Sequence, residues 1–408
     1  MIRRTIMPLF KLVALSIIGG LTSVFLTAEP SIAFTIKNID FLGEAKFATD
    51  TQIKETELGG LSGITYDASK NVYYSISDDR SQKAPARFYT LTIELNEKSL
   101  GAVKFTDVTL LKNQAGQTFP AQSLDPEGIA LTSNGSLYIS SEGDATANNL
   151  TNPFINKFSL TGKQLQALPV DSKYLPTSPQ TSGIRNNLAF ESLTLTPSQK
   201  YLFTATENAL VQDGAEATVA SGSPSRILSY NTATGTLAAE YLYLTAPVAE
   251  PPEIKDGFNT NGIVDLLAID DTHFLSLERS FSVGGKNTIK LYGVSLAGAE
   301  DISDINSLIT ADINNIQPVR KELLLNLNEL NIPLDNIEGL TFGPDLPNGR
   351  RSLIMVSDNN FGSTQFTQVL AFSVEPVPEP SASAGVVAVF ITGLIAKSKS
   401  KLFKAKGK

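Results

Sequence analysis

Acidic residues recur at the edges of short apolar segments and carry most of the chemistry that this sequence offers. One set stands at the start of such segments, and a second set closes the segments that follow. The first set is Glu127, Glu191, Asp265 and Glu338, and the second is Asp78, Glu142, Glu207, Glu278 and Asp358. Two carboxylates about 4 Å apart repel by roughly 4 kcal/mol at an effective dielectric of 20, so converging acids require cations. Oxygen ligands without His or Cys suit calcium rather than zinc.

Further residues would complete such a site. Asp125 and Asp335 stand two or three positions before a glutamate of the first set and would add ligand oxygens. The expected metal ligands are therefore Asp125, Glu127, Glu142, Glu191, Glu278, Asp335 and Glu338. Nearby arginines would neutralise part of the charge, and they are Arg80, Arg87, Arg185, Arg226 and Arg279. Arg185 and Arg279 are either spacers that pair with the acids or clamps that hold an anion.

The residue types that are missing exclude several other chemistries. The chain has no Cys and one His, His273, which excludes thiol nucleophiles, Fe–S clusters, disulfides, HExxH sites and Cys-based zinc sites. A Ser-His-Asp hydrolase would depend on His273, and the chain has no GxSxG pentapeptide for its nucleophile. We expect His273 to be a solvated residue of a hairpin turn.

The acids mark a repeat of two apolar strands joined by a turn. The five copies begin at positions 62, 127, 191, 265 and 338, so their spacings are 65, 64, 74 and 73 residues. The first strands start Ser62-Gly63-Ile64, Glu127-Gly128-Ile129, Glu191-Ser192-Leu193, Asp265-Leu266-Leu267 and Glu338-Gly339-Leu340. The third copy departs from the usual pattern, because Ser192 stands where Gly is expected. So regular a period indicates an array of one supersecondary unit.

Each repeat has room for two more strands, which alternating apolar residues predict. These strands are expected at 88–94 and 103–111, 155–160 and 165–170, 227–230 and 237–244, and 289–296 and 323–327. Four antiparallel strands per repeat predict an all-β β-propeller of five four-stranded blades. The last repeat has only three strands, ending at 369–374, so we expect residues 35–47 to supply its fourth strand and close the ring. Six blades remain open if 246–262 forms strands, and stacked parallel solenoids are the structural alternative. Weak helical periodicity occurs only at 301–309.

The N-terminus has the pattern of a secretory signal peptide. Arg3, Arg4 and Lys11 precede an apolar run at 12–26 and the small residues Ser31 and Ala33. We expect cleavage after Ala33; an N-terminal membrane anchor is the alternative.

The C-terminus combines three features in a fixed order. Val377-Pro378-Glu379-Pro380 precedes an apolar stretch at 382–396, and six lysines follow it. A short apolar segment ending in cations is typical of a stop-transfer signal with its lysines on the cytoplasmic side. The arrangement resembles the PEP-CTERM sorting signal of exopolysaccharide-producing Gram-negative bacteria. That resemblance implies an exosortase that removes the tail, and hence a protein that is transiently anchored by a transmembrane segment and then extracellular or on the cell surface. A simple C-terminal anchor is the alternative.

These boundaries divide the chain into a signal peptide at 1–33, a propeller domain at 34–376 and a sorting signal at 377–408. Without the two end segments, the 33 basic and 41 acidic residues of the chain fall to 24 and 39, a net charge of −15. Such a domain repels nucleic acid and anionic membranes and attracts cations.

Residues of several repeats resemble the phytase-like domain family, also described as having esterase-like activity of phytase. The resemblance is carried by Asn336-Ile337-Glu338-Gly339-Leu340-Thr341-Phe342-Gly343-Pro344, Val356-Ser357-Asp358-Asn359-Asn360, Leu277-Glu278-Arg279-Ser280-Phe281 and Phe190-Glu191-Ser192-Leu193. It covers most of 59–374. The family name rests on distant similarity to β-propeller phytases, which hydrolyse phosphomonoesters with bound calcium.

Two functions follow as hypotheses. The first is a secreted, calcium-dependent hydrolase of a small phosphoester or ester. In it, Glu127, Glu191, Glu338 and Asp358 act as ligands or general base, and Arg185 and Arg279 hold the phosphate. The second is a non-catalytic propeller that binds a glycan or protein in the exopolysaccharide matrix. That function would require an exposed aromatic patch, for which the candidates are Tyr66, Tyr73, Tyr74 and Phe88.

Overall fold

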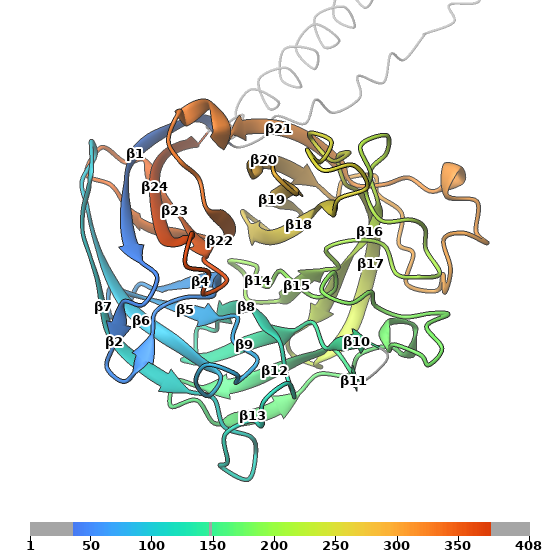
Figure 1. The fold of residues 1–408 in the computed structure, drawn as a ribbon, viewed down its shortest axis with the longest axis horizontal. Coiled ribbons are helices and arrows are strands. Elements are labelled where there is room, and N and C mark those ends of the chain that lie inside the picture. The colour runs from blue at the N-terminus through green and yellow to red at the C-terminus, as the bar shows by residue number, and fades with distance from the viewer. Residues whose placement is uncertain (1–35, 147–148, 377–408) are drawn as a thin grey trace, which may run out of the picture. The chain divides into compact units, whose positions relative to one another are not determined.

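The computed structural model describes residues 36–146 and 149–376 (Figure 1). The expected signal peptide at 1–33 and sorting signal at 377–408, including its apolar stretch, lie outside these residues and stay predictions. Within the two described ranges, no helix is long and apolar enough to cross a membrane.

The described chain folds into five four-stranded antiparallel sheets, the blades of a β-propeller. Blade 1 has β4 (Leu61–Asp67), β5 (Val72–Ser77), β6 (Arg87–Leu95) and β7 (Leu100–Leu110), and blade 2 has β8 (Pro126–Leu131), β9 (Ser136–Ser141), β12 (Phe154–Ser159) and β13 (Gln164–Ala167). Blade 3 has β14 (Thr194–Leu195), β15 (Tyr201–Ala205), β16 (Pro224–Asn231) and β17 (Thr236–Leu244), and blade 4 has β18 (Asn259–Ala268), β19 (His273–Ser282), β20 (Thr288–Ser295) and β21 (Arg320–Asn326). Blade 5 has β22 (Asn336–Asp345), β23 (Arg351–Asp358), β24 (Phe366–Pro376) and β1 (Ile36–Ala48).

Short elements occupy the connections between these strands. Two hairpins are formed by β2 (Gln52–Ile53) with β3 (Thr56–Glu57) and by β10 (Asp144–Thr146) with β11 (Asn149–Thr151). The helical turns are η1 (Ser172–Tyr174), η2 (Ile313–Asn315) and η3 (Leu327–Leu330). The helical periodicity at 301–309 was misleading, because this segment forms turns. Its apolar residues Ile302 and Leu308 instead pack with Leu242 in a small separate cluster.

The predicted ring closure is confirmed. β1 pairs antiparallel with β24 from Ile36 opposite Pro376 to Ala48 opposite Phe366. The first strand of the chain therefore covers the edge that the last strand would otherwise expose. The five-blade count is also confirmed, since no strand lies between β17 and β18.

Apolar side chains are buried between neighbouring blades. Each adjacent pair of blades shares a cluster, and Ile76 of blade 1 packs in one with Ile139 of blade 2. Ile354 of blade 5 packs in another with Tyr73 of blade 1. Because each blade buries both of its faces, the strands are rich in apolar residues, and the polar groups collect at strand ends and around the central channel.

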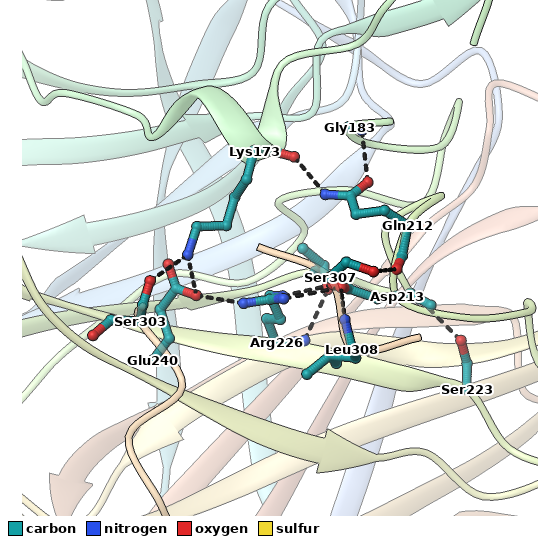
Figure 2. A network of polar contacts seen from close by, with 12 residues as sticks. Lys173, Gly183, Gln212, Asp213, Ser223, Arg226, Glu240, Ser303, Ser307 and Leu308 are labelled. Carbon is teal, nitrogen blue, oxygen red and sulfur yellow. Dashed lines mark hydrogen bonds and ion pairs between the residues drawn. The ribbon is translucent and has the colours of Figure 1, made fainter. Parts of the chain in front are cut away.

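Blades 3 and 4 are also joined by buried charges (Figure 2). The guanidinium of Arg226 contacts Asp213 through Nε (2.6 Å) and Nη2 (2.9 Å), and its Nη1 lies 2.8 Å from Glu240 Oε2. Lys173 Nζ lies 3.1 Å from the same oxygen of Glu240. The side chains of Arg226, Asp213 and Glu240 are inaccessible to solvent. Such charges are stable only when paired.

The long connection between β20 and β21 of blade 4 is fastened to this network. The carbonyl of Ser303 accepts a hydrogen bond from Lys173 Nζ (2.6 Å), and the Leu308 N–H donates to Asp213 Oδ1 (2.9 Å). Ser307 Oγ donates to the Gln212 carbonyl (2.7 Å). The connection thus lies against blade 3, and the charges that hold it are not part of the central channel.

Candidate functional site

β-Bulges on the inner strands of blades 2 and 5 position two acids of the first set, Glu127 and Glu338. In blade 5 the pairing of β22 with β23 skips Glu338, because Ile337 pairs with Ser357 and Gly339 with Val356. The irregular step in blade 2 spans Glu127. The residues at the same step are Ser62 in blade 1 and Val264 in blade 4. A bulged residue leaves the strand alternation, which lets its side chain face the end of the channel.

The second strands supply the other set at a matching height. In blades 1, 2 and 5 a serine pairs with the residue just before the bulge, and an acid follows that serine. The pairs are Ser77-Asp78, Ser141-Glu142 and Ser357-Asp358. In blade 4 that partner of the bulge is Glu278, and the next residue is Arg279. Arg279 therefore occupies the position that other blades give to an acid.

An open cavity of about 1060 Å³ lies at one end of the channel. Its charged floor residues are Asp78, Glu127, Glu191, Arg279, Glu338 and Asp358. The opposite end of the channel has a smaller hollow of about 280 Å³, lined by apolar and threonine side chains together with Arg351. The two ends of the ring thus differ sharply in charge.

One acid cluster joins blades 1 and 2. Asp78, Asp125 and Glu127 each place a carboxylate oxygen within 4.8 Å of the other two. Arg80 forms an ion pair with Asp125 and donates to Asn187 Oδ1 at 2.7 Å. Asp125 Oδ1 is buried and has no hydrogen-bond partner among the described residues. Arg80 supplies one positive charge to this cluster, which contains three carboxyl groups.

A second acid cluster joins blades 2 and 3. Glu142, Glu191 and Glu207 also bring carboxylate oxygens within 4.8 Å of one another. Glu142 Oε1 accepts a hydrogen bond from the Ala189 N–H, but Glu142 Oε2 and Glu207 Oε2 are buried without a partner in the described chain. Buried polar atoms are rarely left unpaired. These oxygens therefore fit ligands of a bound cation.

Arg279 supplies the positive charge of the floor. Its Nη2 lies 3.2 Å from Glu338 Oε1 and 3.4 Å from Glu207 Oε1. Its Nε is buried with no hydrogen-bond partner in the described ranges, so the guanidinium keeps unused donor capacity. Glu338 Oε1 also accepts from Asn336 Nδ2 at 2.8 Å. A buried arginine beside an open cavity suits an anion as well as the acids around it.

Burial raises the pKa of every acid on this floor and in the two clusters, and neighbouring acids add to the effect in most of them. The pKa of Glu142 rises to about 8 through burial and the charge of Glu207. Burial raises the pKa of Glu207 and Glu338 to about 7, although Arg279 opposes the rise in both. Burial and the other acids raise the pKa of Glu191 well above its usual value. Glu142 therefore mostly keeps its proton at neutral pH, and Glu207 and Glu338 are partly protonated, unless a cation replaces the protons.

Glu278 does not lie in the ring where the sequence analysis placed it. Its Oε1 accepts from Tyr243 Oη (2.7 Å) and pairs with Lys321, and its Oε2 accepts from Asn261 Nδ2 (2.9 Å). It does not line the cavity. Strand alternation is the reason, because Arg279 faces the channel and the preceding residue must face the other way.

Asp265 is also displaced from its expected ring. It pairs opposite Leu277 one residue after the bulge, where most other blades have Gly. Its Oδ1 accepts from the Leu266 N–H and its Oδ2 from the Leu340 N–H, both at 2.8 Å. The carboxyl is buried and joins the inner strands of blades 4 and 5, so its role is structural.

Two further candidates are held by backbone groups. Asp335 lines the cavity, but its oxygens accept from the N–H groups of Asn336 and Phe366, both at 2.8 Å. Arg185 lies away from the cavity lining and donates to the carbonyls of Ala209 (3.0 Å) and Gly214 (2.8 Å). Arg185 therefore does not reach the anion position that was predicted for it.

The aromatic candidates for a binding patch pack inside blade 1. Tyr73, Tyr74 and Phe88 are buried, and the ring of Tyr66 lies 4.7 Å from that of Tyr73. They do not line the acidic cavity.

Counting along the second strands would have identified Arg279. In blades 2, 4 and 5 the residue after the bulge partner comes five positions after the first apolar residue of its strand: Glu142 follows Leu137, Arg279 follows Phe274 and Asp358 follows Leu353. Asp265 resembles the acids that start the other copies, so the alignment of the copies placed it at the bulge, where the structure has Val264 instead.

A family model described as "Phytase-like: Esterase-like activity of phytase" matches residues 56–361. A protein of Arthroderma benhamiae named "Uncharacterized secreted protein" is 30% identical over 115 residues, which cover 22% of this chain and 21% of that protein. The chain therefore spans about a fifth of the length of that curated relative.

Solved structures with similar backbones have low sequence identity. The periplasmic gluconolactonase of Pseudomonas aeruginosa is 11% identical with a TM-score of 0.32, and the match covers 79% of this chain and 88% of that one. The PQQ-bound aldose sugar dehydrogenase of Streptomyces coelicolor is 16% identical with a TM-score of 0.31, covering 78% and 84%.

Proposed function

The chain belongs to the phytase-like family, and from its acidic cavity we propose a calcium-dependent hydrolase of phosphomonoesters. The observation that carries the proposal is that both acid clusters reach the floor of one open cavity beside Arg279, through Asp78 and Glu127 of the first cluster and Glu191 of the second. The same clusters contain the buried carboxylate oxygens that have no partner in the described chain. The oxygens suit a hard cation, and the guanidinium suits a phosphate. A net charge of −15 in the domain would otherwise repel such an anion.

The two acid clusters would hold the cation. Asp78, Asp125 and Glu127 form one oxygen-rich set, and Glu142, Glu191 and Glu207 form the other. A bound divalent cation would neutralise carboxylates, polarise a phosphoryl oxygen and lower the pKa of water. Their oxygen-only chemistry favours calcium or magnesium over transition metals.

Arg279 and Glu338 would act on the substrate from the same floor. Arg279 would bind a phosphoryl oxygen through its guanidinium and stabilise the charge that develops on it. Glu338 Oε1 is engaged by Arg279 and Asn336, while Oε2 has no hydrogen-bond partner in the described chain. We assign Oε2 as the acceptor of a proton from the attacking water. A pKa of about 7 suits general-base work near neutral pH.

Hydrolysis assays test this function. The purified protein should release phosphate from p-nitrophenyl phosphate in calcium, lose most of that activity in EDTA and regain it when calcium is restored. Glu338→Gln should lower kcat by about 10²-fold or more, as expected on removing a general base. Glu322→Gln, on exposed β21, is the matched control. Activity on p-nitrophenyl acetate alone, or activity unaffected by EDTA, would contradict the proposal.

We further propose that the protein acts outside the cell. The signal-peptide pattern at 1–33, the sorting motif at 377–380 and the secreted relative support export. Changing Pro378 and Glu379 to Ala should leave the full-length protein in the membrane fraction, because the motif that an exosortase would recognise is lost. Release of the variant at the normal level would show that the motif has no role in sorting.

A further inference from the structure

The wall of the acidic cavity becomes aromatic toward its open end. Arg279 and Phe281 are two positions apart on β19 and line the cavity together. Phe258, directly before β18, also lines it, and its ring centroid lies 6.2 Å from that of Phe281 at an interplanar angle of 39°. Phe258 is 58% exposed. A ligand whose anionic group reaches Arg279 would therefore pass a pair of aromatic rings.

The charges of the lining limit how many phosphates such a ligand can carry. Its cations are Arg279 and Lys286, and its acids are Asp78, Glu127, Glu191, Asp335, Glu338 and Asp358. Arg279 is already shared with Glu207 and Glu338. One phosphate can be compensated at Arg279, but further phosphates nearer the opening would find only Lys286 as a cationic side chain.

Polar side chains of blade 5 complete the opening. Asn360 and Thr364 line the cavity and are exposed. Within the described chain, neither side chain has a hydrogen-bond partner, so the Asn360 amide and the Thr364 hydroxyl are available to hydroxyl groups of a ligand. Apolar surface combined with a few polar groups is the usual composition of a small-molecule site.

We propose that the substrate is the monophosphate of an uncharged, hydroxylated ring, with the phosphate at Arg279 and one face of the ring against Phe258 and Phe281. This inference rests on the proposed hydrolase function and narrows its substrate class. It differs from what the family name suggests, because a ring that carries many phosphates does not match the charges of the lining.

Three phosphoesters test separately whether the site requires a ring and how many phosphates it accepts. Glucose 6-phosphate has the ring and one phosphate, glycerol 3-phosphate lacks the ring, and inositol hexakisphosphate has many charges. In calcium, kcat/KM should be highest for glucose 6-phosphate. Phe258→Ala should raise its KM about 3- to 10-fold with little change in kcat, as expected for the loss of one ring contact, and should not affect glycerol 3-phosphate. Phe258→Tyr should restore the wild-type KM. Leu165→Ala, at an exposed apolar residue of β13, is the matched control.

Two kinetic results would overturn the inference: the highest kcat/KM for inositol hexakisphosphate, or equal effects of Phe258→Ala on the ring and acyclic substrates. A protein that releases phosphate from none of the three would refute the hydrolase function instead. In that case, ligand-observed NMR measures whether glucose 6-phosphate binds at the aromatic pair, independently of turnover. Binding that Phe258→Ala weakens and Phe258→Tyr restores supports the ring site, and binding that is absent or unchanged in Phe258→Ala overturns it.

Discussion

A substitution at Glu142 tests whether the acid cluster binds a cation or is only a set of carboxyls that repel one another. Glu142→Gln keeps the size of the side chain and an oxygen that accepts from the Ala189 N–H, but it removes the carboxylate. Because the pKa of Glu142 is about 8 without a cation, the wild-type carboxyl is mostly protonated at pH 7. The neutral amide imitates that state, so the free energy of unfolding without cations should change by less than about 1 kcal/mol.

Calcium should distinguish the two proteins. At a hundredfold excess over the dissociation constant, binding stabilises the folded state by about 2.7 kcal/mol. A two-state unit of about 340 residues unfolds with roughly 0.7 kcal/mol/K of entropy, so the wild-type Tm should rise by about 4 °C. The variant should lose most of this increase, because one ligand oxygen and its charge are gone.

Calorimetry at pH 7, in EDTA and in calcium, measures this difference. Titration of calcium in buffers with different ionisation enthalpies should also show proton release by the wild type and less by the variant, since the cation displaces the proton of Glu142. Glu322→Gln should behave as the wild type. A wild-type Tm that does not respond to calcium, or a variant with the full increase, would refute the assignment of Glu142 as a ligand.

Three further outcomes are expected. In EDTA, Tm should fall as the pH rises from 5 to 8. The pKa values of Glu142, Glu207 and Glu338 are raised in the folded state, so the stability that these groups contribute is fully present below the usual carboxyl pKa and is lost as the pH rises through the raised values. Thermal melts in which Tm rises over this range would contradict the prediction. Deleting β1 should cause aggregation or broad unfolding, and a single unchanged calorimetric transition would refute its closing role. Arg226→Met should lower the free energy of unfolding by about 3–5 kcal/mol in denaturant titrations, since it leaves buried carboxylates unpaired, and a loss below about 1 kcal/mol would show that this network is dispensable.

The fold was predictable because its signals are local and repeated. The four spacings between the five copies and the alternating apolar residues defined the blades, and the three-strand final repeat indicated that residues from the N-terminus complete it. The turns at 301–309 were not predictable, because their apolar residues pack against blade 3 rather than along one face of a helix.

The acids that reach the end of the channel were predictable in four blades, whereas in blade 4 the expected residues are displaced by one position. A bulge moves every later side chain to the opposite face, so a match of residue types does not guarantee a match of direction. Asp265 and Glu278 resembled the acids of other copies, whereas Val264 and Arg279 occupy their positions. The contacts of Arg185 depend on how a long connection folds, which its sequence does not indicate.

The pairing of Ile36 with Pro376 fixes the direction in which the acidic cavity faces. Phe366, at the other end of β24, lines the cavity, so Pro376 lies about 11 residues of extended strand away, near the hollow at the opposite end. An extended strand of that length spans roughly 35 Å. The described chain therefore ends near the hollow that Arg351 lines. The acidic cavity opens at the other end of the ring, so a dissolved ligand can approach it from the side away from Pro376.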